Sequence, residues 1–293
     1  MISLKVLARL KKSLTSFPDE INLSPLARSF TSQVARIDDI DKISLIERQN
    51  LSIQPACGEI NGCEIMENGD LLIIDSFNKV LTYWYKNGNN QKRRVFEQTP
   101  CDVTRLDGNE VAIATSDACV TVIDCKSKNL KILRSYPVNR KCSGIDYQNG
   151  TQIIVTGDTV LSIHNLKNDV KLDVDRQCEN VNRISCHKDK IVCSDENNDS
   201  VYCINFSGKV VWKFRDACLR KPFGIASDNK GYIYVAGQDS NNVVVIAPDG
   251  RNKRVLLSGF FRPRSLAISK SQNKLLVSDE GAQTLLLYDI LQK

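Results

Sequence analysis

Basic side chains recur just before apolar segments in the middle and later parts of the chain. Such side chains can bind phosphate groups or acidic peptide segments through charge-assisted hydrogen bonds. Phe260 and Phe261 lie in the same stretches, and an aromatic ring near cations can stack on a nucleobase. The residues predicted to form a face that binds a partner or RNA are Arg140, Lys141, Arg183, Arg220, Lys221, Phe223, Arg262 and Arg264.

A second candidate chemistry is the binding of a hard divalent cation. The oxygen donors that such an ion prefers are found at Glu64, Asp102, Asp146 and Asn182. Acidic side chains at such positions are more often simply hydrated. We therefore expect no metal ligand and no cofactor.

Hydrolytic chemistry has little support in the sequence. There is no Gly-x-Ser-x-Gly nucleophile motif and no glycine-rich phosphate loop. The only two histidines, His164 and His187, have no visible serine or cysteine partner, and both are expected to be structural. We expect no catalytic residue, and hence a protein that is not an enzyme.

The eleven cysteines include no C-x-x-C pair, and two histidines cannot complete a zinc-finger set. The cysteines are expected to be reduced, buried thiols in a cytoplasmic protein.

The N-terminus carries Lys5, Arg9, Lys11 and Lys12 and does not resemble a secretory signal, although a basic start also occurs in mitochondrial presequences. No apolar run is long enough to span a membrane. A net charge of +6 is too small to argue for DNA or RNA by itself.

These candidate residues lie within a sequence pattern that returns six times. Its clearest part is a short apolar segment preceded by a turn residue. The segments are residues 71–74, 111–114, 153–155, 191–193, 233–235 and 275–277. The turn residues, which tolerate positive φ, are Gly69, Gly108, Gly150, Asp189, Gly231 and Asn273, at intervals of 39 to 42 residues.

A second apolar segment follows each of these, as in Val120 to Ile123 and Val243 to Ile246. With a preceding and a following strand, each unit has four strands in about 40 residues, which is typical of a propeller blade. The sequence therefore predicts an all-β, six-bladed β-propeller over residues 42–293.

The last unit ends near Ile290 without a fourth strand, whereas residues 43–46 form an orphan strand before the first unit. We expect this N-terminal strand to close the ring and remove an exposed sheet edge. Residues 1–41 lie outside the ring. In that part Ile2, Val6 and Leu10 recur every four residues and predict a short amphipathic helix followed by a linker. This helix would pack on the propeller, belong to a longer helix or lie on a membrane surface.

The fifth unit carries Pro222-Phe223-Gly224-Ile225-Ala226, then Asp228, Gly231 and Ile233-Tyr234-Val235-Ala236. This order resembles an NHL repeat, and the sixth unit keeps part of it in residues 262–267 and 277–279. The chain thus resembles the C-terminal half of tripartite-motif proteins of the NHL class. The fold resemblance covers about residues 43–290, and the motif is sharp in one and a half units.

The resemblance implies the recruiting half of a ubiquitin ligase, since the zinc-binding RING that recruits the ubiquitin-charged enzyme is missing from this sequence. It also implies a fragment or truncated relative that associates with a RING-bearing protein. Some NHL propellers bind single-stranded RNA on the face considered above. The senescence-marker and gluconolactonase family, in contrast, has a similar shape and holds a divalent metal in its channel.

Acidic loops are expected on the same face as the basic ones. They carry Asp75, Asp117, Asp158, Asp195, Glu196, Asp199, Asp239, Asp279 and Glu280. Because mixed charge suits a protein partner better than a phosphate backbone, protein recruitment is the preferred function. Single-stranded RNA binding is the alternative, and a lactonase-like metal enzyme is the second alternative.

Overall fold

A computed structural model describes residues 40–52, 58–87, 91–138, 142–148, 150, 152–157, 160–165, 170–175, 178, 181–279 and 284–292. The chain divides into two compact units, Met1–Asp38 and Asp39–Lys293, and only the second is described below. The helix expected near the N-terminus lies outside the described residues. Within the described ranges, no helix is long and apolar enough to cross a membrane.

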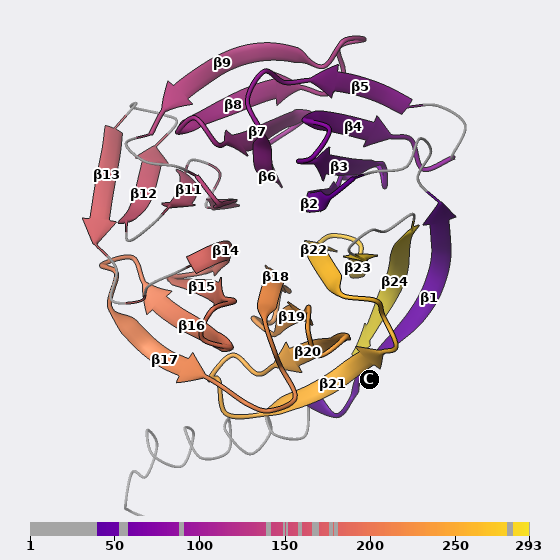
Figure 1. Ribbon diagram of the computed structural model, residues 1–293, viewed down its shortest axis with the longest axis vertical. Coiled ribbons are helices and arrows are strands. Elements are labelled where there is room, and N and C mark those ends of the chain that lie inside the picture. Colours follow the sequence, from indigo (N-terminus) through magenta and orange to yellow (C-terminus); the bar gives the residue numbers. More distant parts are fainter. Residues whose placement is uncertain are drawn as a thin grey trace, which may run out of the picture. The chain divides into compact units, whose positions relative to one another are not determined.

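The second unit is a β-propeller of six four-stranded antiparallel sheets around a common centre (Figure 1). The first sheet holds β2 (Ile60–Ile65), β3 (Leu71–Asp75), β4 (Val80–Trp84) and β5 (Gln91–Val95). The second holds β6 (Pro100–Arg105), β7 (Glu110–Thr115), β8 (Cys119–Asp124) and β9 (Lys131–Pro137). The third holds β10 (Gly144–Gln148), β11 (Gln152–Gly157), β12 (Val160–Asn165) and β13 (Val170–Asp175).

The fourth sheet holds β14 (Val181–His187), β15 (Lys190–Asp195), β16 (Ser200–Asn205) and β17 (Val210–Phe214). The fifth holds β18 (Pro222–Ser227), β19 (Ile233–Gly237), β20 (Asn242–Ile246) and β21 (Lys253–Ser258). The sixth holds β22 (Pro263–Ser269), β23 (Lys274–Asp279), β24 (Thr284–Gln292) and β1 (Ile43–Ser52). We call these sheets blades 1 to 6. In each blade the first strand is innermost and the fourth outermost.

The burial of each strand explains the sequence pattern. Every residue of β3 and β20 is buried, because the middle strands of a blade are covered on both faces by neighbouring blades. The outer strand β5 instead alternates between exposed and half-buried residues. Continuous apolar runs therefore occur in the second and third strands, and alternation occurs in the fourth.

The turns before the second strands contain a residue with positive φ, as expected, and in one blade that residue lies one position earlier than predicted. Gly69 and Gly231 adopt φ of 87° and 84°, and Asn273 adopts 50°. In the fourth blade the residue with positive φ is Lys188 (55°), one position before the expected Asp189. Position in the turn, more than residue preference, therefore determines which residue adopts the left-handed conformation.

The ring is closed by antiparallel pairing of β1 with β24 (Figure 1). The pairing runs from Ile43 opposite Gln292 to Ser52 opposite Thr284, with a bulge between Glu47 and Gln49. The closing strand is longer than the expected residues 43–46. Its first residue, Ile43, is fully buried in the core of blades 5 and 6.

Seven of the ten described cysteines are buried. Cys193 and Cys203, for example, are fully buried in the middle strands of blade 4. They pack there as small hydrophobes.

Truncation of Ile43 tests the closing strand. We expect Ile43→Ala to lower the free energy of unfolding by about 2–5 kcal/mol, because it opens a cavity in a filled core. Ile46→Ala is the matched control, since Ile46 lies in the same strand but is 42% exposed. It should cost less than about 1 kcal/mol. Chemical denaturation measures both, and equal losses would show that β1 contributes no buried anchor.

Candidate functional site

The loops that enter each blade and the loops that join its second and third strands share one face of the ring. Backbone hydrogen bonds link them directly. Ser76 donates to Glu59 (2.9 Å), Ser116 to Thr99 (2.9 Å) and Gln238 to Lys221 (3.1 Å). We call this side the entry face and the other side the opposite face. The described members of the predicted partner-binding set, from Arg183 to Arg264, come from the entry face or the inner strands beside it.

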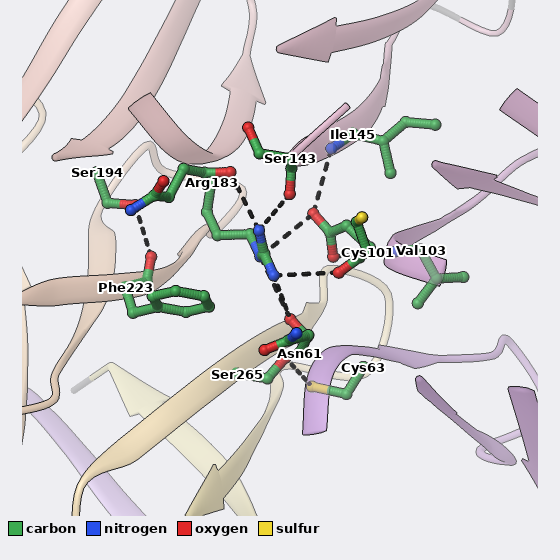
Figure 2. A network of polar contacts seen from close by, with 12 residues as sticks. Asn61, Cys63, Cys101, Val103, Ser143, Ile145, Arg183, Ser194, Phe223 and Ser265 are labelled. Carbon is green, nitrogen blue, oxygen red and sulfur yellow. Dashed lines mark hydrogen bonds and ion pairs between the residues drawn. The ribbon is translucent and has the colours of Figure 1, made fainter. Parts of the chain in front are cut away.

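Arg183, at the start of inner strand β14, lies near the centre of the ring and is 6% exposed. Its guanidinium group donates hydrogen bonds to the carbonyl oxygens of Asn61 (3.0 Å), Cys101 (3.1 Å) and Ser143. Figure 2 shows the three acceptors around the guanidinium group. They belong to or adjoin the inner strands of blades 1, 2 and 3. The cation also lies 3.8 Å from the carboxylate of Asp102. One side chain thus fastens the blade that carries it to three others.

Phe223 extends this cluster to the remaining blades. The guanidinium carbons of Arg183 and Arg264 lie 4.6 Å and 4.4 Å from the centre of its ring. Arg264, from blade 6, also bonds Asn61 Oδ1 (2.5 Å) and pairs with Glu59 (2.7 Å). We call Arg183, Phe223 and Arg264 the central cluster. Because Phe223 is 6% exposed, its ring offers little surface to a partner.

The other predicted residues lie further out on the entry face. Arg220 is exposed. Lys221 pairs with Glu196 (3.9 Å), and Arg262 pairs with Asp239 (3.6 Å). Arg140 and Lys141 lie outside the described residues. The structure therefore separates the described part of the predicted set into a central cluster and an outer group. Arg183 and Phe223 of the cluster are buried and Arg264 is half-buried, whereas Lys221 and Arg262 of the outer group are ion-paired with the neighbouring acidic loops.

Two exposed aromatic side chains stand out on the entry face. Phe77, between β3 and β4, is 75% exposed, and Phe261, between β21 and β22, is 72% exposed. Phe261 was expected near this surface. Phe77 was missed, although an aromatic residue in a turn between Asp75 and Lys79 is a readable signal.

A small cavity of about 80 Å³ lies at the centre of the ring. Glu64, Asp102 and Asp146 line it together, as their inner-strand positions suggested, with Arg183 and Lys270 among the lining residues. Asn182, the fourth predicted oxygen donor, is not part of the lining. Burial raises the pKa of Glu64 to about 7. It raises the pKa of Asp102 to about 6, with the nearby Arg183 acting in the opposite direction, and it also raises the pKa of Asp146.

The three carboxylates hydrogen-bond to the backbone of the next blade. Glu64 accepts from the Arg105 amide (3.2 Å), Asp102 from Ile145 (3.2 Å) and Asp146 from Cys186 (2.6 Å). Each also accepts the amide of the residue that follows it. No group of three or more His, Cys, Asp or Glu side chains that could hold a metal occurs in the described part of the chain. These acids therefore fit the role of links between blades.

The raised carboxyl pKa values predict how stability depends on pH. Folding buries Glu64 and Asp102, whose pKa values rise from 4.5 and 3.8 to about 7 and about 6. The folded state thus binds more protons than the unfolded state, and these two groups make stability fall as pH rises from 5 to 8. Removing one of them should flatten this dependence.

Chemical denaturation of the wild type and Glu64→Gln at pH 5, 6, 7 and 8 tests this. We expect the unfolding free energy of the variant to fall less steeply between pH 6 and 8. The readout is the difference in slope, because the amide also changes the hydrogen bonds to Ile65 and Arg105. Parallel curves would show that Glu64 does not titrate in this range.

Arg183→Met tests the central cluster. Removing the guanidinium group leaves Asp102 without its cation and three backbone carbonyls without their donor, so we expect a loss of about 3–5 kcal/mol in unfolding free energy. Arg93→Met, in the exposed outer strand β5, is the control and should change stability by less than about 0.5 kcal/mol. A loss below about 1 kcal/mol for Arg183→Met would refute the linking role.

No protein-family model and no curated protein matches the chain. Solved structures do match its fold. A streptogramin B lyase is 16% identical, with a TM-score of 0.63 over 86% of this chain and 87% of that one. A protein of unknown function from Bacteroides thetaiotaomicron is 10% identical, with a TM-score of 0.71 over 85% and 76%.

A luciferin-regenerating enzyme is 10% identical, with a TM-score of 0.64 over 83% of this chain and 95% of that one. At these identities the likeness shows the β-propeller fold alone. Two of these three proteins are enzymes by name, so the comparisons give no support to a non-enzymatic role. The resemblance to tripartite-motif proteins of the NHL class remains a prediction.

Proposed function

We propose that this propeller is a platform that binds a protein partner through its entry face. The observation that carries the proposal is the pair of exposed rings on that face, Phe77 and Phe261, at 75% and 72% exposure. Aromatic residues are enriched at protein interfaces and often anchor them.

The charges around these rings favour protein over nucleic acid. Lys221 and Arg262 are paired with Glu196 and Asp239, and Arg264 is paired with Glu59. A phosphate backbone would have to break these pairs, and it would also meet the acidic partners. A protein surface with both signs of charge can complement such a pattern. Arg220 is exposed, and in the alternative function it and Phe261 would contact single-stranded RNA.

The centre of the ring supports binding more than catalysis. The cavity is small, and each of its three carboxylates accepts hydrogen bonds from backbone amides. We further propose that the partner is a substrate of the ubiquitin pathway in the cytoplasm, with ligase activity supplied by a RING-bearing relative. This finer assignment rests on the NHL-like residues of blade 5 and on no geometry of the ring.

Affinity purification from the native tissue tests the proposal. The wild type is compared with Phe77→Ser/Phe261→Ser, and each sample is divided into RNase-treated and untreated halves. Val211→Ser/Val255→Ser is the matched control, because these side chains are 49% and 43% exposed on outer strands β17 and β21.

We expect a set of proteins that resists RNase and falls at least about tenfold with the double phenylalanine variant, which corresponds to about 1.4 kcal/mol of binding free energy. The control should retain that set. Partners that disappear with RNase would instead favour the RNA alternative. Retention of every partner by the phenylalanine variant would refute the entry-face platform.

A further inference from the structure

A second cavity lies on the opposite face of the ring, away from the entry face and the central cluster. It is a cleft of about 380 Å³ between blades 1 and 6, where the closing strand β1 meets β24. Its walls come from the β2–β3 turn with Asn68 and Gly69, the β4–β5 turn with Lys86, and the β22–β23 turn with Gln272. We call it the seam cleft.

The seam cleft has an excess of positive charge. Its lining includes Arg48, Lys86 and Lys274, and its one carboxylate is that of Asp289. Arg48 bonds Asp289 through Nε at 2.5 Å. Lys274 is opposite Asp289 in the β23–β24 pairing, so this carboxylate lies between two cations. Within the lining, one negative charge among three positive ones leaves a net charge of about +2, which complements a dianion. Asp70 is buried behind the lining, where its carboxylate accepts hydrogen bonds from the side chain of Asn68 and the amide of Lys86.

The position of Arg48 depends on an irregularity of the closing strand. The register of β1 shifts between Glu47 and Gln49, so Arg48 is the extra residue of a β-bulge. A bulge re-aims a side chain relative to the regular alternation of the strand. The Nε contact with Asp289 leaves the two terminal nitrogens of the guanidinium group as further donors for a ligand.

The floor and walls of the cleft are polar. Gly69 adopts φ of 87°, and a Cβ built on it would approach Lys86 and Gln272 at 3.5 Å and 3.7 Å. Gln272 donates to the carbonyls of Met66 (3.2 Å) and Glu67 (2.8 Å), which bridges the two blades and leaves its amide oxygen as an acceptor. Gln49 and Asn68 add two further amides, and Leu287 is the one aliphatic hydrophobic side chain of the lining.

We propose that the seam cleft binds a small phosphomonoester with a hydroxyl-rich body, such as a phosphorylated sugar. A phosphomonoester carries about −1.5 to −2 charges at neutral pH, which matches the excess charge of the lining. The volume lies within the range of about 300–1,000 Å³ found for small-molecule sites and exceeds what a phosphate alone would fill. Amide groups match hydroxyls, which can both donate and accept hydrogen bonds.

Isothermal titration calorimetry of the full chain tests the site at low ionic strength, where charge effects are least screened. The probes are glucose 6-phosphate, inorganic phosphate, glucose and a phosphoserine peptide. The cleft variant is Lys86→Gln/Lys274→Gln. The control variant is Lys131→Gln/Lys209→Gln, which removes the same charge from exposed positions in blades 2 and 4.

We expect glucose 6-phosphate to bind with a saturable 1:1 isotherm, more tightly than inorganic phosphate, and glucose alone to show no binding. The cleft variant should weaken binding at least about tenfold, and the control variant should not. Lys86→Arg/Lys274→Arg should restore most of the affinity. Thermal unfolding of each variant confirms that it is folded.

Three results would overturn the proposal. The first is that neither phosphate probe shows saturable binding to the wild type. The second is that the control variant loses as much affinity as the cleft variant, which would indicate a general charge effect. The third is that the phosphoserine peptide binds more tightly than the sugar phosphate, which would assign the cleft to a phosphorylated protein segment.

Discussion

The pairing of β1 with β24 is the constraint on which the rest of the molecule depends. Without it, blade 6 would be a three-stranded sheet and the ring would expose an unpaired edge. Bringing the two ends of the ring together costs chain entropy, but that cost grows only slowly with the length of chain between them. The long register from Ile43 to Ser52 and the burial of Ile43 offset it. The central cavity, the entry face and the seam cleft all presuppose this closure.

Polar links between blades fix the centre of the closed ring. Arg183 bonds to carbonyls of three other blades, and buried acids such as Glu64 accept amides from the blade that follows. The charged side chains at the centre of the ring therefore hold the inner strands in place. The cavity between them has a volume of only about 80 Å³. The larger and more exposed features lie on the two outer faces. A rigid centre with variable loops around it suits a scaffold whose binding properties reside on its surface.

The strand pattern of the ring was readable because it depends on local sequence. The second strands, the turns at Gly69 and Asn273, and the pairing of an N-terminal strand with the last blade all follow from periodicity and turn chemistry. The site was less readable because its contacts join residues far apart in the chain. Arg183 and Phe223 were expected on a binding face, yet each is 6% exposed. Their burial depends on which carbonyls and rings closure brings to the centre.

Long-range contacts also give the basic run in β5 a role that the sequence does not reveal. From sequence alone, the basic run Lys92-Arg93-Arg94 in an outer strand is expected to protect a sheet edge. Lys92 donates to three backbone carbonyls of the β8–β9 turn, including Cys125 (2.9 Å) and Ser127 (3.1 Å), and Arg94 donates to Leu130 (2.9 Å). These side chains fasten the outer strand of blade 1 to the next blade. A cation in an outer strand thus serves as a link when the adjoining turn presents its carbonyls.

The antiparallel closure also sets how the ring responds to mechanical load. Ile43 and Gln292 are directly opposite each other, at the same end of the β1–β24 pair. A force that pulls these two residues apart acts on the β1–β24 hydrogen bonds at one end of the pair first, so the bonds break one after another. A load along the strands would instead have to break many bonds at once. The β1–β24 pair therefore resists a force between the two ends of the ring less than a force along its strands, although closure is what stabilises the ring at rest.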